Sequence, residues 1–418
     1  MITGTYWWSR YGDFPPGDFN QPHHGAVISC YRKRRGWTQQ DLAIAAGVEW
    51  RTVREWEAIA MLNDTARRIF LAKLLRIPPA LLGLDWRLLG YQDAHGTPTA
   101  QESLSELAAE DAYYHYEDIL TLAWQARRQG TLVSYLYRLK RCLSRLELAT
   151  RQAPSHDREA WQALLCRYYR LAAEIERDQG ASDPHARQRV LDYYASALRL
   201  AEELEDPQLA GATWMSLTEA QLEYGNPAEA KRAAEGALQY SERVQPVLRG
   251  NIYLVSAAAH APFAVEDETL RSQCRRWQEQ ATTLAYRRPP EDDGSFLKLN
   301  LAGVHHERAK TLLVFGEQQG DPLLLQQARE ELALAWQALT PDLVLWQLYF
   351  SLTEARLHLA ANELEASAHS AKEALGLARF MQSRQGKEQV QQLYERLQER
   401  DSNNPHVLHL GVELGLFS

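Results

Sequence analysis

Two short helices joined by a tight turn are encoded by the segment Tyr31-Arg-Lys-Arg-Arg-Gly-Trp-Thr-Gln-Gln-Asp-Leu-Ala-Ile-Ala-Ala-Gly-Val-Glu-Trp-Arg-Thr-Val-Arg-Glu-Trp-Glu57. Thr38 and Asp41 form a near capping box, which places a helix start directly after Thr38. Gly47 is able to adopt a positive φ, so the first helix should end at Ala46. The segment therefore predicts a helix of about two turns and a glycine turn before the next helix.

The second helix of the segment has two different faces. Val53 and Trp56 are three residues apart and should pack inward together with Val48. The outward face carries two arginines and consists of Trp50, Arg51, Arg54 and Glu55. Such a face suits a groove better than bulk solvent.

At these positions the segment resembles the XRE, or lambda-repressor-like, helix-turn-helix family, whose core commonly reads G-L-T-Q-x-x-L-A-x-x-x-G-V-S-x-x-T-I-x-x-W-E. The corresponding residues are Gly36, Trp37, Thr38, Gln39, Leu42, Ala43, Gly47, Val48, Thr52, Val53, Trp56 and Glu57. The resemblance continues from Asn63 to Asp85, where Leu-Leu-Arg-Ile-Pro-Pro-Ala-Leu-Leu-Gly-Leu is similar to the closing helices of the family. It implies a five-helix domain over residues 23–88.

The resemblance implies binding of double-stranded DNA. Gln39 would hydrogen-bond the phosphate backbone, whereas Trp50 and Arg51 would meet base edges in the major groove. The full implied set is Arg32, Arg34 and Arg35, with Lys33, before the motif, Thr38 and Gln39 at its first helix, and Trp50, Arg51, Arg54 and Glu55 on its second. The alternative is a structural helical hairpin with solvated arginines, which is the usual interpretation of a charge run alone.

Glu49 departs from the family pattern, which usually has Ser at the start of the second motif helix. A carboxylate at this position either accepts a hydrogen bond from a cytosine amino group or repels phosphate and weakens binding. Glu49 is therefore the position at which base reading and phosphate repulsion are most easily separated.

The whole chain is acidic, but its charge is unevenly distributed. The formal net charge is −8 over 418 residues, whereas residues 23–85 hold ten Lys or Arg against six Asp or Glu, a balance of +4. A small basic module on an acidic body is what site-specific DNA binding requires, and it argues against a protein that coats nucleic acid indiscriminately.

Cysteine usage and hydropathy bear on the cellular compartment. The four cysteines show neither C-x-x-C spacing nor clustering, so we expect reduced core residues rather than disulfides or a zinc site. The first ten residues lack the basic start and apolar run of a signal peptide, and no apolar run of about 18 residues occurs. We expect a cytoplasmic protein without a membrane span.

The segments on either side of the motif domain differ in composition. Residues 1–22 form an arm in which six Tyr, Trp and Phe residues are spread among Pro and Gly, and this is too aromatic for an ordinary disordered tail. This arm either packs against the helices or contacts DNA or a partner. Residues 89–101 contain Gly90-Tyr-Gln-Asp-Ala-His-Gly-Thr-Pro-Thr99, which has the turn residues of a linker.

Residues 102–400 have helical periodicity and no strand pattern, so the chain is expected to be all-α. Trp214-x2-Leu217, Gly225-Asn-Pro and the alanines at 230, 234 and 237 fall on the register of the tetratricopeptide repeat (TPR). They predict a TPR-like right-handed α-solenoid, closed by an amphipathic helix near Lys387 to Arg400. A compact helical bundle is the alternative, although it does not explain the shared register. Residues 401–418 are expected to form a C-terminal tail.

Motifs for catalysis, metals or cofactors are absent from the sequence. There is no G-x-x-x-x-G-K-[ST] loop, no strand-linked G-x-G-x-x-G and no H-E-x-x-H. His305 and His306 are adjacent, and adjacent helical residues point about 100° apart, so they seldom bind one ion. We expect no enzyme activity, no catalytic or metal-ligating residue and no cofactor.

A DNA-binding module joined to a TPR-like body resembles the peptide-responsive quorum-sensing regulators of bacteria. That resemblance implies a homodimer whose concave groove binds a short peptide or protein ligand that controls DNA binding, because amide side chains pair the free N–H and C=O groups of a peptide. The expected groove residues are Tyr169, Arg170, Asn251, Asn300 and Arg356. The alternative function is a TPR scaffold or adaptor in which the helix-turn-helix serves assembly or tethering.

Overall fold

The computed structural model describes residues 8, 11–17, 21–75, 77–84, 109–132, 136–153, 155, 157–180, 183–287 and 295–416. Over these residues the chain is all-helical, as predicted, apart from one isolated backbone bridge between Pro16 and Pro22. The chain divides into two compact units, residues 1–106 and residues 107–418. The predicted linker at 89–101 lies outside the described residues. No described helix is long and apolar enough to cross a membrane.

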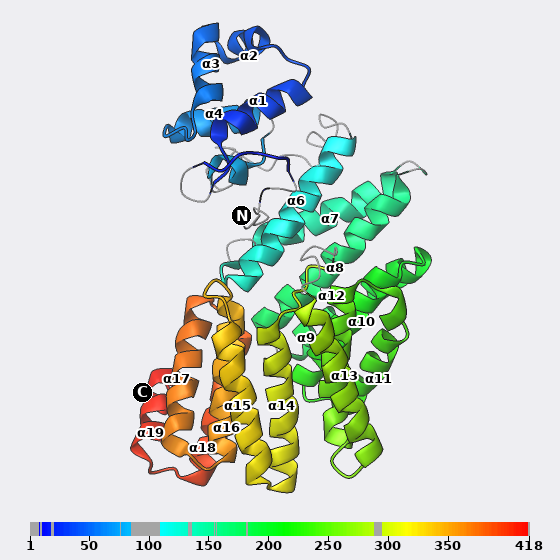
Figure 1. The fold of residues 1–418 in the computed structure, drawn as a ribbon, viewed down its shortest axis with the longest axis vertical. Helices are drawn as coiled ribbons and strands as arrows, with labels where there is room; N and C mark the ends of the chain where they lie inside the picture. The colour runs from blue at the N-terminus through cyan, green and yellow to red at the C-terminus, as the bar shows by residue number, and fades with distance from the viewer. Residues whose placement is uncertain are drawn as a thin grey trace. The chain divides into compact units, whose positions relative to one another are not determined.

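In the described part of the first unit there are four α-helices and one short 3-10 helix (Figure 1). These are α1 (His24–Arg34), α2 (Gln39–Ala46), α3 (Trp50–Ala58), α4 (Thr65–Leu75) and η1 (Pro79–Leu82). The last described element of the predicted five-helix domain is thus a 3-10 turn, and the end of that domain, residues 85–88, lies outside the described residues. Pro79 cannot donate a backbone hydrogen bond, and Gly83 ends the turn with φ +61°. Too few residues remain between them for an α-helix to propagate.

The bounds of α2 are set by its caps. The Thr38 side chain accepts a hydrogen bond from the Asp41 N–H, and the Asp41 carboxylate accepts from the Thr38 N–H at 2.7 Å, which completes a capping box. Gly47 has φ 64° and donates its N–H back to the last turn. The predicted start after Thr38 and end at Ala46 are therefore confirmed.

The aromatic arm contributes to the core of the first unit. Trp8, Tyr11 and Phe14 are buried in one cluster with side chains from α1 to η1. The Trp8 indole N–H donates to the Phe14 carbonyl at 3.0 Å, so the ring is both packed and hydrogen-bonded. For these three residues, the packing interpretation of the arm is correct.

The second unit is built from longer helices (Figure 1). Its α-helices are α6 (Ala109–Arg128), α7 (Leu136–Gln152), α8 (Arg158–Gly180), α9 (Pro184–Glu203), α10 (Pro207–Glu223), α11 (Pro227–Leu238), α12 (Pro246–His260), α13 (Glu268–Tyr286), α14 (Leu301–Gln319), α15 (Pro322–Ala338), α16 (Val344–Ala360), α17 (Leu364–Phe380), α18 (Arg384–Arg400) and α19 (Pro405–Leu414). Two 3-10 turns, η4 (Ser241–Arg243) and η5 (Ala261–Phe263), flank α12.

Several helices of this unit begin at an Asp-Pro or Asn-Pro pair. The Asp or Asn side chain caps the helix, and the proline occupies the first turn, where its missing N–H has no intrahelical partner to lose. This arrangement starts α9, α10, α15 and α19 at Asp183, Asp206, Asp321 and Asn404. The chain therefore specifies its own helix boundaries locally.

The helices pack in consecutive pairs, and the even-numbered helices form an inner ring. Each of α8, α10, α12, α14 and α16 packs along the odd-numbered helix that follows it. In addition, α8, α10, α12, α14, α16 and α18 contact one another in that order, and α18 returns to contact α8. We call these six helices the inner ring. Small residues of α11 allow its close approach to α10 and α12, since Ala230, Ala234 and Ala237 are fully buried.

Most of the segment predicted only as a C-terminal tail, residues 401–418, is helical. It contains α19, which packs against α17 and α18. The Asn404 side chain caps the helix, and Val407 and Leu410, three residues apart, are buried against the preceding helices. The Asn-Pro start and this apolar spacing are the local signals that predict the helix.

Candidate functional site

The exposed face of α3 is the first candidate site. Val53 and Trp56 are buried and fix the helix to the core, whereas Trp50 remains 46% exposed. Arg51, Arg54 and Glu55 are also exposed. The Arg54 guanidinium lies over the Trp50 ring, 5.3 Å from its centroid, which orders two long side chains on the surface. The four residues predicted to read DNA on this helix therefore share one open face.

A buried network around Glu57 connects α1, α2 and α3. Arg32 donates from Nε and Nη2 to the two Glu57 carboxylate oxygens, at 2.5 and 3.2 Å, and from Nη1 to the Trp37 carbonyl at 2.6 Å. The Gln39 amide donates to Glu57 Oε2 at 2.7 Å. The Arg32 side chain is only 8% exposed. The prediction that Arg32 contacts phosphate is therefore wrong, because its donors are used inside the unit.

The other basic residues before α2 remain on or near the surface. Arg34 is exposed, donates to the Tyr11 carbonyl at 2.7 Å and lies over the Tyr31 ring. Arg35 is half-buried and lies over the Trp37 ring. These contacts orient both guanidinium groups, and Arg34 remains exposed.

The N-termini of α2 and α3 differ in a way that bears on Glu49. Thr38 caps α2 and is exposed, and its hydrogen bonds hold the pKa of the Asp41 carboxyl below its ordinary value. Glu49 occupies the same position before α3 but makes no capping hydrogen bond with its side chain. Its carboxylate is therefore available at the start of α3, where a helix N-terminus favours negative charge.

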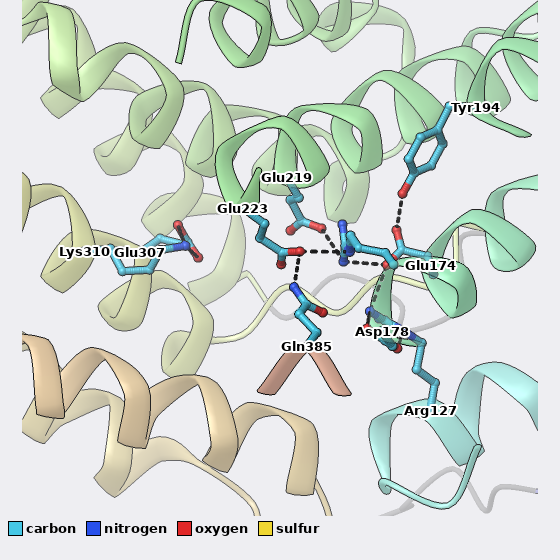
Figure 2. Close-up of polar contacts among 10 residues, drawn as sticks. Arg127, Glu174, Asp178, Tyr194, Glu219, Glu223, Glu307, Lys310 and Gln385 are labelled. Atoms are coloured by element: carbon cyan, nitrogen blue, oxygen red, sulfur yellow. Dashed lines mark hydrogen bonds and ion pairs between the residues drawn. The ribbon is translucent and has the colours of Figure 1, made fainter. Parts of the chain in front are cut away.

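Charged and polar side chains converge inside the second unit and form the second candidate site. We call this set the central charged cluster; it consists of Arg127 of α6, Glu174, Arg177 and Asp178 of α8, Glu219 and Glu223 of α10, Glu307 and Lys310 of α14, and Gln385 of α18 (Figure 2). Members far apart in sequence meet because the inner ring closes. The Gln385 amide, for example, donates to the Glu223 carboxylate 162 residues away.

Arg177 lies at the middle of these contacts. Its guanidinium is 2% exposed and approaches Glu174 at 2.7 Å, Glu223 at 3.1 Å and Glu219 at 4.0 Å. Glu174 is shared with Arg127, whose Nη2 lies 2.9 Å from the same carboxylate. Burial opposes the ionisation of Glu174, but Arg177 and Arg127 hold its pKa below its ordinary value.

Glu219 has a different environment from the other carboxylates. Burial among protein groups, followed by the negative charges of Glu174, Glu223 and Glu307, raises its pKa to about 7 despite the opposing effect of Arg177. Its side chain nevertheless keeps 43% of its surface exposed. Glu219 is therefore enclosed by charged helices and still reached by water, which places it on the solvated interior surface rather than in the packed core.

The five residues predicted to line a ligand groove are not brought together into one surface. Asn251 donates its amide to the Val247 carbonyl one turn earlier at 2.8 Å, and Asn300 caps α14 by accepting from the Gly303 N–H at 3.0 Å. Both amides therefore have roles within their own helices. Arg356 remains partly exposed and bridges from α16 to Glu317 of α14 at 3.0 Å.

Tyr169 faces away from the inner ring. Its hydroxyl donates to Glu147 of α7 at 2.8 Å, and its ring stacks with Tyr193 of α9. The inward stripe of α8 instead contains Arg170, Glu174 and Arg177, spaced by four and three residues. A one-position difference thus turns Tyr169 by about 100° away from that stripe.

Arg170 is on the inward stripe but is covered by the chain itself. The extended segment 295–300 runs past it: the Ser295 carbonyl accepts from the Arg170 guanidinium, and Phe296 stacks on Trp124 at 5.8 Å between ring centroids. Arg170 is 2% exposed as a result. Its predicted role in an open groove is therefore wrong, because the segment before α14 already occupies that position.

The adjacent histidines of α14 point to different partners. His305 pairs with Glu331 of α15 at 2.6 Å, whereas His306 is buried against Phe350 and contacts the Thr353 hydroxyl at 2.9 Å. Burial holds the pKa of His306 well below its ordinary value, so it is neutral at physiological pH. In the described parts of the chain, no three His, Cys, Asp or Glu side chains are grouped so as to hold a metal ion.

Sequence reasoning missed the residues that organise both sites. Glu57 is part of the motif, but its role depends on Arg32, 25 residues away. The central charged cluster had one visible signal, namely the charged stripe Arg170, Glu174 and Arg177 on a largely apolar helix. Comparison with known proteins adds no assignment, since no family model and no curated protein matches the chain.

Proposed function

We propose that this protein is a sequence-specific DNA-binding transcription regulator whose second unit binds a peptide or protein ligand that controls DNA binding. In this proposal α2 and α3 act as a helix-turn-helix of the XRE type, and α3 enters the major groove. The second unit acts as a TPR-like right-handed solenoid that senses the ligand. The protein binds an inverted repeat as a homodimer, with half-sites about one helical turn apart or a multiple of it.

The observation that carries this proposal is the exposed face of α3. Two arginines and an ordered Trp50 ring project from a helix that is otherwise held by buried side chains and two capped neighbours. Arginine recognises guanine through two parallel hydrogen bonds, so a rigid helix with Arg51 and Arg54 on its open face suits base reading. The Glu57 network supports the same role, because it fixes α1 and α2 against α3.

Selection of bound sequences from random duplex DNA, followed by fluorescence anisotropy on the enriched site, tests the proposal. The variant Arg51→Ala/Arg54→Ala should bind the selected site at least about 30-fold more weakly, because each bidentate base contact contributes about 1–3 kcal/mol and about 1.4 kcal/mol corresponds to tenfold. The slope of log affinity against log salt should fall only slightly if these arginines read bases rather than phosphates.

Arg275→Ala/Arg276→Ala is the matched control, because it removes the same charge from an exposed stretch of α13. This control should bind the selected site as tightly as the unaltered protein. Enrichment of no sequence, or equal binding by the Arg51→Ala/Arg54→Ala variant, would show that α3 does not read DNA.

A scaffold function is the second candidate, and exposed apolar side chains of the first unit favour it. Ile44 on α2 is 76% exposed and Trp50 on α3 is 46% exposed. Contiguous exposed apolar surface marks protein-binding sites, and α2 and α3 are neighbouring helices. Under this alternative, Ile44→Ser would abolish a protein complex that is isolated with the full chain and would leave DNA affinity unchanged. A DNA-reading protein, by contrast, would bind its operator in the absence of any partner protein.

A further inference from the structure

The interior of the inner ring has more carboxylates than cations. Five carboxylates, from Glu174, Asp178, Glu219, Glu223 and Glu307, face four cations, from Arg127, Arg177 and Lys310 of the cluster and from Arg170, whose charge also acts on Glu174. Burying ions is costly unless they are fully paired, and an unbalanced set is costlier still. Folding alone therefore does not account for the additional negative charge.

A second observation shows that the network also has an unused donor. Nη1 and Nε of Arg177 are buried and have no hydrogen-bond partner in the structure, and the side chain is only 2% exposed. Nη2 donates to Glu174 of α8, whereas Nε lies 3.1 Å from the Glu223 carboxylate of α10 without making a hydrogen bond. Buried donors are nearly always satisfied in folded proteins, so an unused one beside unbalanced carboxylates indicates a place for a further polar group.

Several side chains of the cluster keep exposed surface despite their central position. The side chains of Glu219 and Lys310 are 43% and 36% exposed, and those of Glu223 and Glu307 are 20% and 22% exposed. Glu219 and Glu223 project from one face of α10, one turn apart, whereas Glu307 and Lys310 project from α14 (Figure 2). The exposed surface of these side chains is therefore available to a small polar group.

We propose that the central charged cluster binds an ammonium group with a carbonyl oxygen beside it, as found at the amino terminus of a peptide or in a free amino acid. The ammonium group supplies the missing positive charge at Glu219 and Glu223. The neighbouring oxygen supplies the acceptor that Arg177 lacks. This inference rests on the proposed function, because it assigns a ligand class to the unit that senses a ligand.

Isothermal titration of the full-length protein without DNA tests this assignment with three probes, namely trialanine amide, N-acetyl-trialanine amide and alanine amide. The free-amine tripeptide should bind at millimolar concentration or tighter, and the acetylated one at least about tenfold more weakly, because acetylation removes the charge. Comparable affinity for alanine amide would assign a free amino acid as the ligand; much weaker affinity would assign a peptide terminus. Equal affinity for the free and acetylated tripeptides, or binding of neither, would overturn the proposal.

Variants of Glu219 locate the site. Glu219→Gln should weaken trialanine amide binding about tenfold, because it removes one of the charges that faces the ammonium group, and Glu219→Asp should restore most of the affinity. Glu399→Gln, which makes the same change on the exposed side of α18, should leave it unaltered. Undiminished binding by Glu219→Gln, or equal losses in the Gln and Asp variants, would place the ligand elsewhere.

Fluorescence anisotropy with operator DNA is measured separately on the same proteins. If the protein binds the free-amine probe but no DNA, the ligand assignment stands and the proposed regulatory function is wrong. If the protein binds DNA but binds the free and acetylated probes equally, the regulatory function stands and the ligand assignment is wrong. The two failures are therefore distinguishable.

Discussion

Each unit of the protein contains a buried pair of a guanidinium and a carboxylate, Arg32–Glu57 in the first unit and Arg177–Glu174 in the second. The two pairs differ in how many of the arginine nitrogens have a hydrogen-bond partner. Arg32 uses all its nitrogens on Glu57 and the Trp37 carbonyl. Arg177 faces three carboxylates, and its Nη1 and Nε still make no hydrogen bond. A complete pair holds helices in place and needs nothing more. An incomplete and unbalanced one is better suited to receive a ligand.

Charge balance explains this difference. The first network contains one guanidinium, one carboxylate and neutral amide groups, so it has no net charge. The second has an excess of carboxylates, and one of them, Glu219, has a pKa raised to about 7 because burial and its acidic neighbours oppose its ionisation. Strongly shifted pKa values are found most often where a protein binds or reacts.

The largest effect is expected from Glu174→Gln. This change leaves Arg127 and Arg177 facing each other without the shared carboxylate, and an unpaired buried charge costs about 3–5 kcal/mol of unfolding free energy. Urea unfolding monitored by circular dichroism measures the loss. The same change at the exposed Glu203 of α9 should cost less than about 0.5 kcal/mol. A loss below about 1 kcal/mol at Glu174 would mean that the cluster is not held together by this carboxylate.

Gly25→Ala tests how rigidly α1 and α3 of the first unit are packed against each other. A Cβ at Gly25 would lie 2.3 Å from the backbone carbonyl oxygen of Glu57, so α1 and α3 must separate, at a cost of about 3 kcal/mol. In the second unit, a Cβ at Gly250 meets only the flexible Leu299 side chain. Gly250→Ala should therefore cost about 1 kcal/mol. Equal losses in the melting curves of the two variants would contradict the contrast between a rigid frame and an adjustable packing.

Glu57→Gln tests whether the Arg32–Glu57 network of the first unit contributes to stability and, separately, to DNA binding. The variant weakens the bonds to Arg32 and Gln39, and we expect a loss of about 2 kcal/mol of unfolding free energy. DNA affinity should fall even at temperatures where the variant remains folded, because Gln39 is no longer oriented. Glu55→Gln, on the exposed face of the same helix, is the stability control. If Glu57→Gln unfolds as readily as the unaltered protein, the network has no structural role.

Glu219→Gln is expected to give the smallest effect, and it should be stabilising. The folded-state pKa of about 7 lies above the ordinary 4.5, so between these pH values the folded chain binds more protons than the unfolded chain. The contribution of Glu219 to stability therefore falls as pH rises through this window and is lost above about pH 7. After allowance for its solvent exposure, the variant should be about 1 kcal/mol more stable than the unaltered protein at pH 8 and no more stable at pH 4.5. A difference that does not change with pH would contradict the shifted pKa.

Local sequence was sufficient to predict the helical class and many helix ends. Thr38, Asp41 and Gly47 specify α2 through contacts within a few residues, and Asp-Pro pairs do the same for longer helices. The inward and outward faces of α3 also followed from spacing alone, because a helix turns by a fixed angle per residue. Proline and glycine limit the segment Pro79–Leu82 to a 3-10 turn, where the family pattern predicted an α-helix.

Side-chain partners could not be predicted in the same way. Arg32 and Arg170 look like surface cations in the sequence, yet one pairs with Glu57 and the other with the carbonyl of Ser295, 125 residues away. Tyr169 was assigned to the wrong face because the register of α8 depends on which residues pack against α7 and α9. Each of these outcomes depends on a segment that no local pattern identifies.

The sequence by itself determined where helices begin and end and which face of α3 is open, because caps, glycine turns and helical periodicity act over one or two turns. Only the tertiary structure decided which charges are buried together. Closure of the inner ring brings α18 onto α8 and places carboxylates from separate helices around Arg177. Electrostatic interactions at short range depend on distance in space rather than along the chain, so the charge imbalance that marks the central charged cluster exists only in the folded protein.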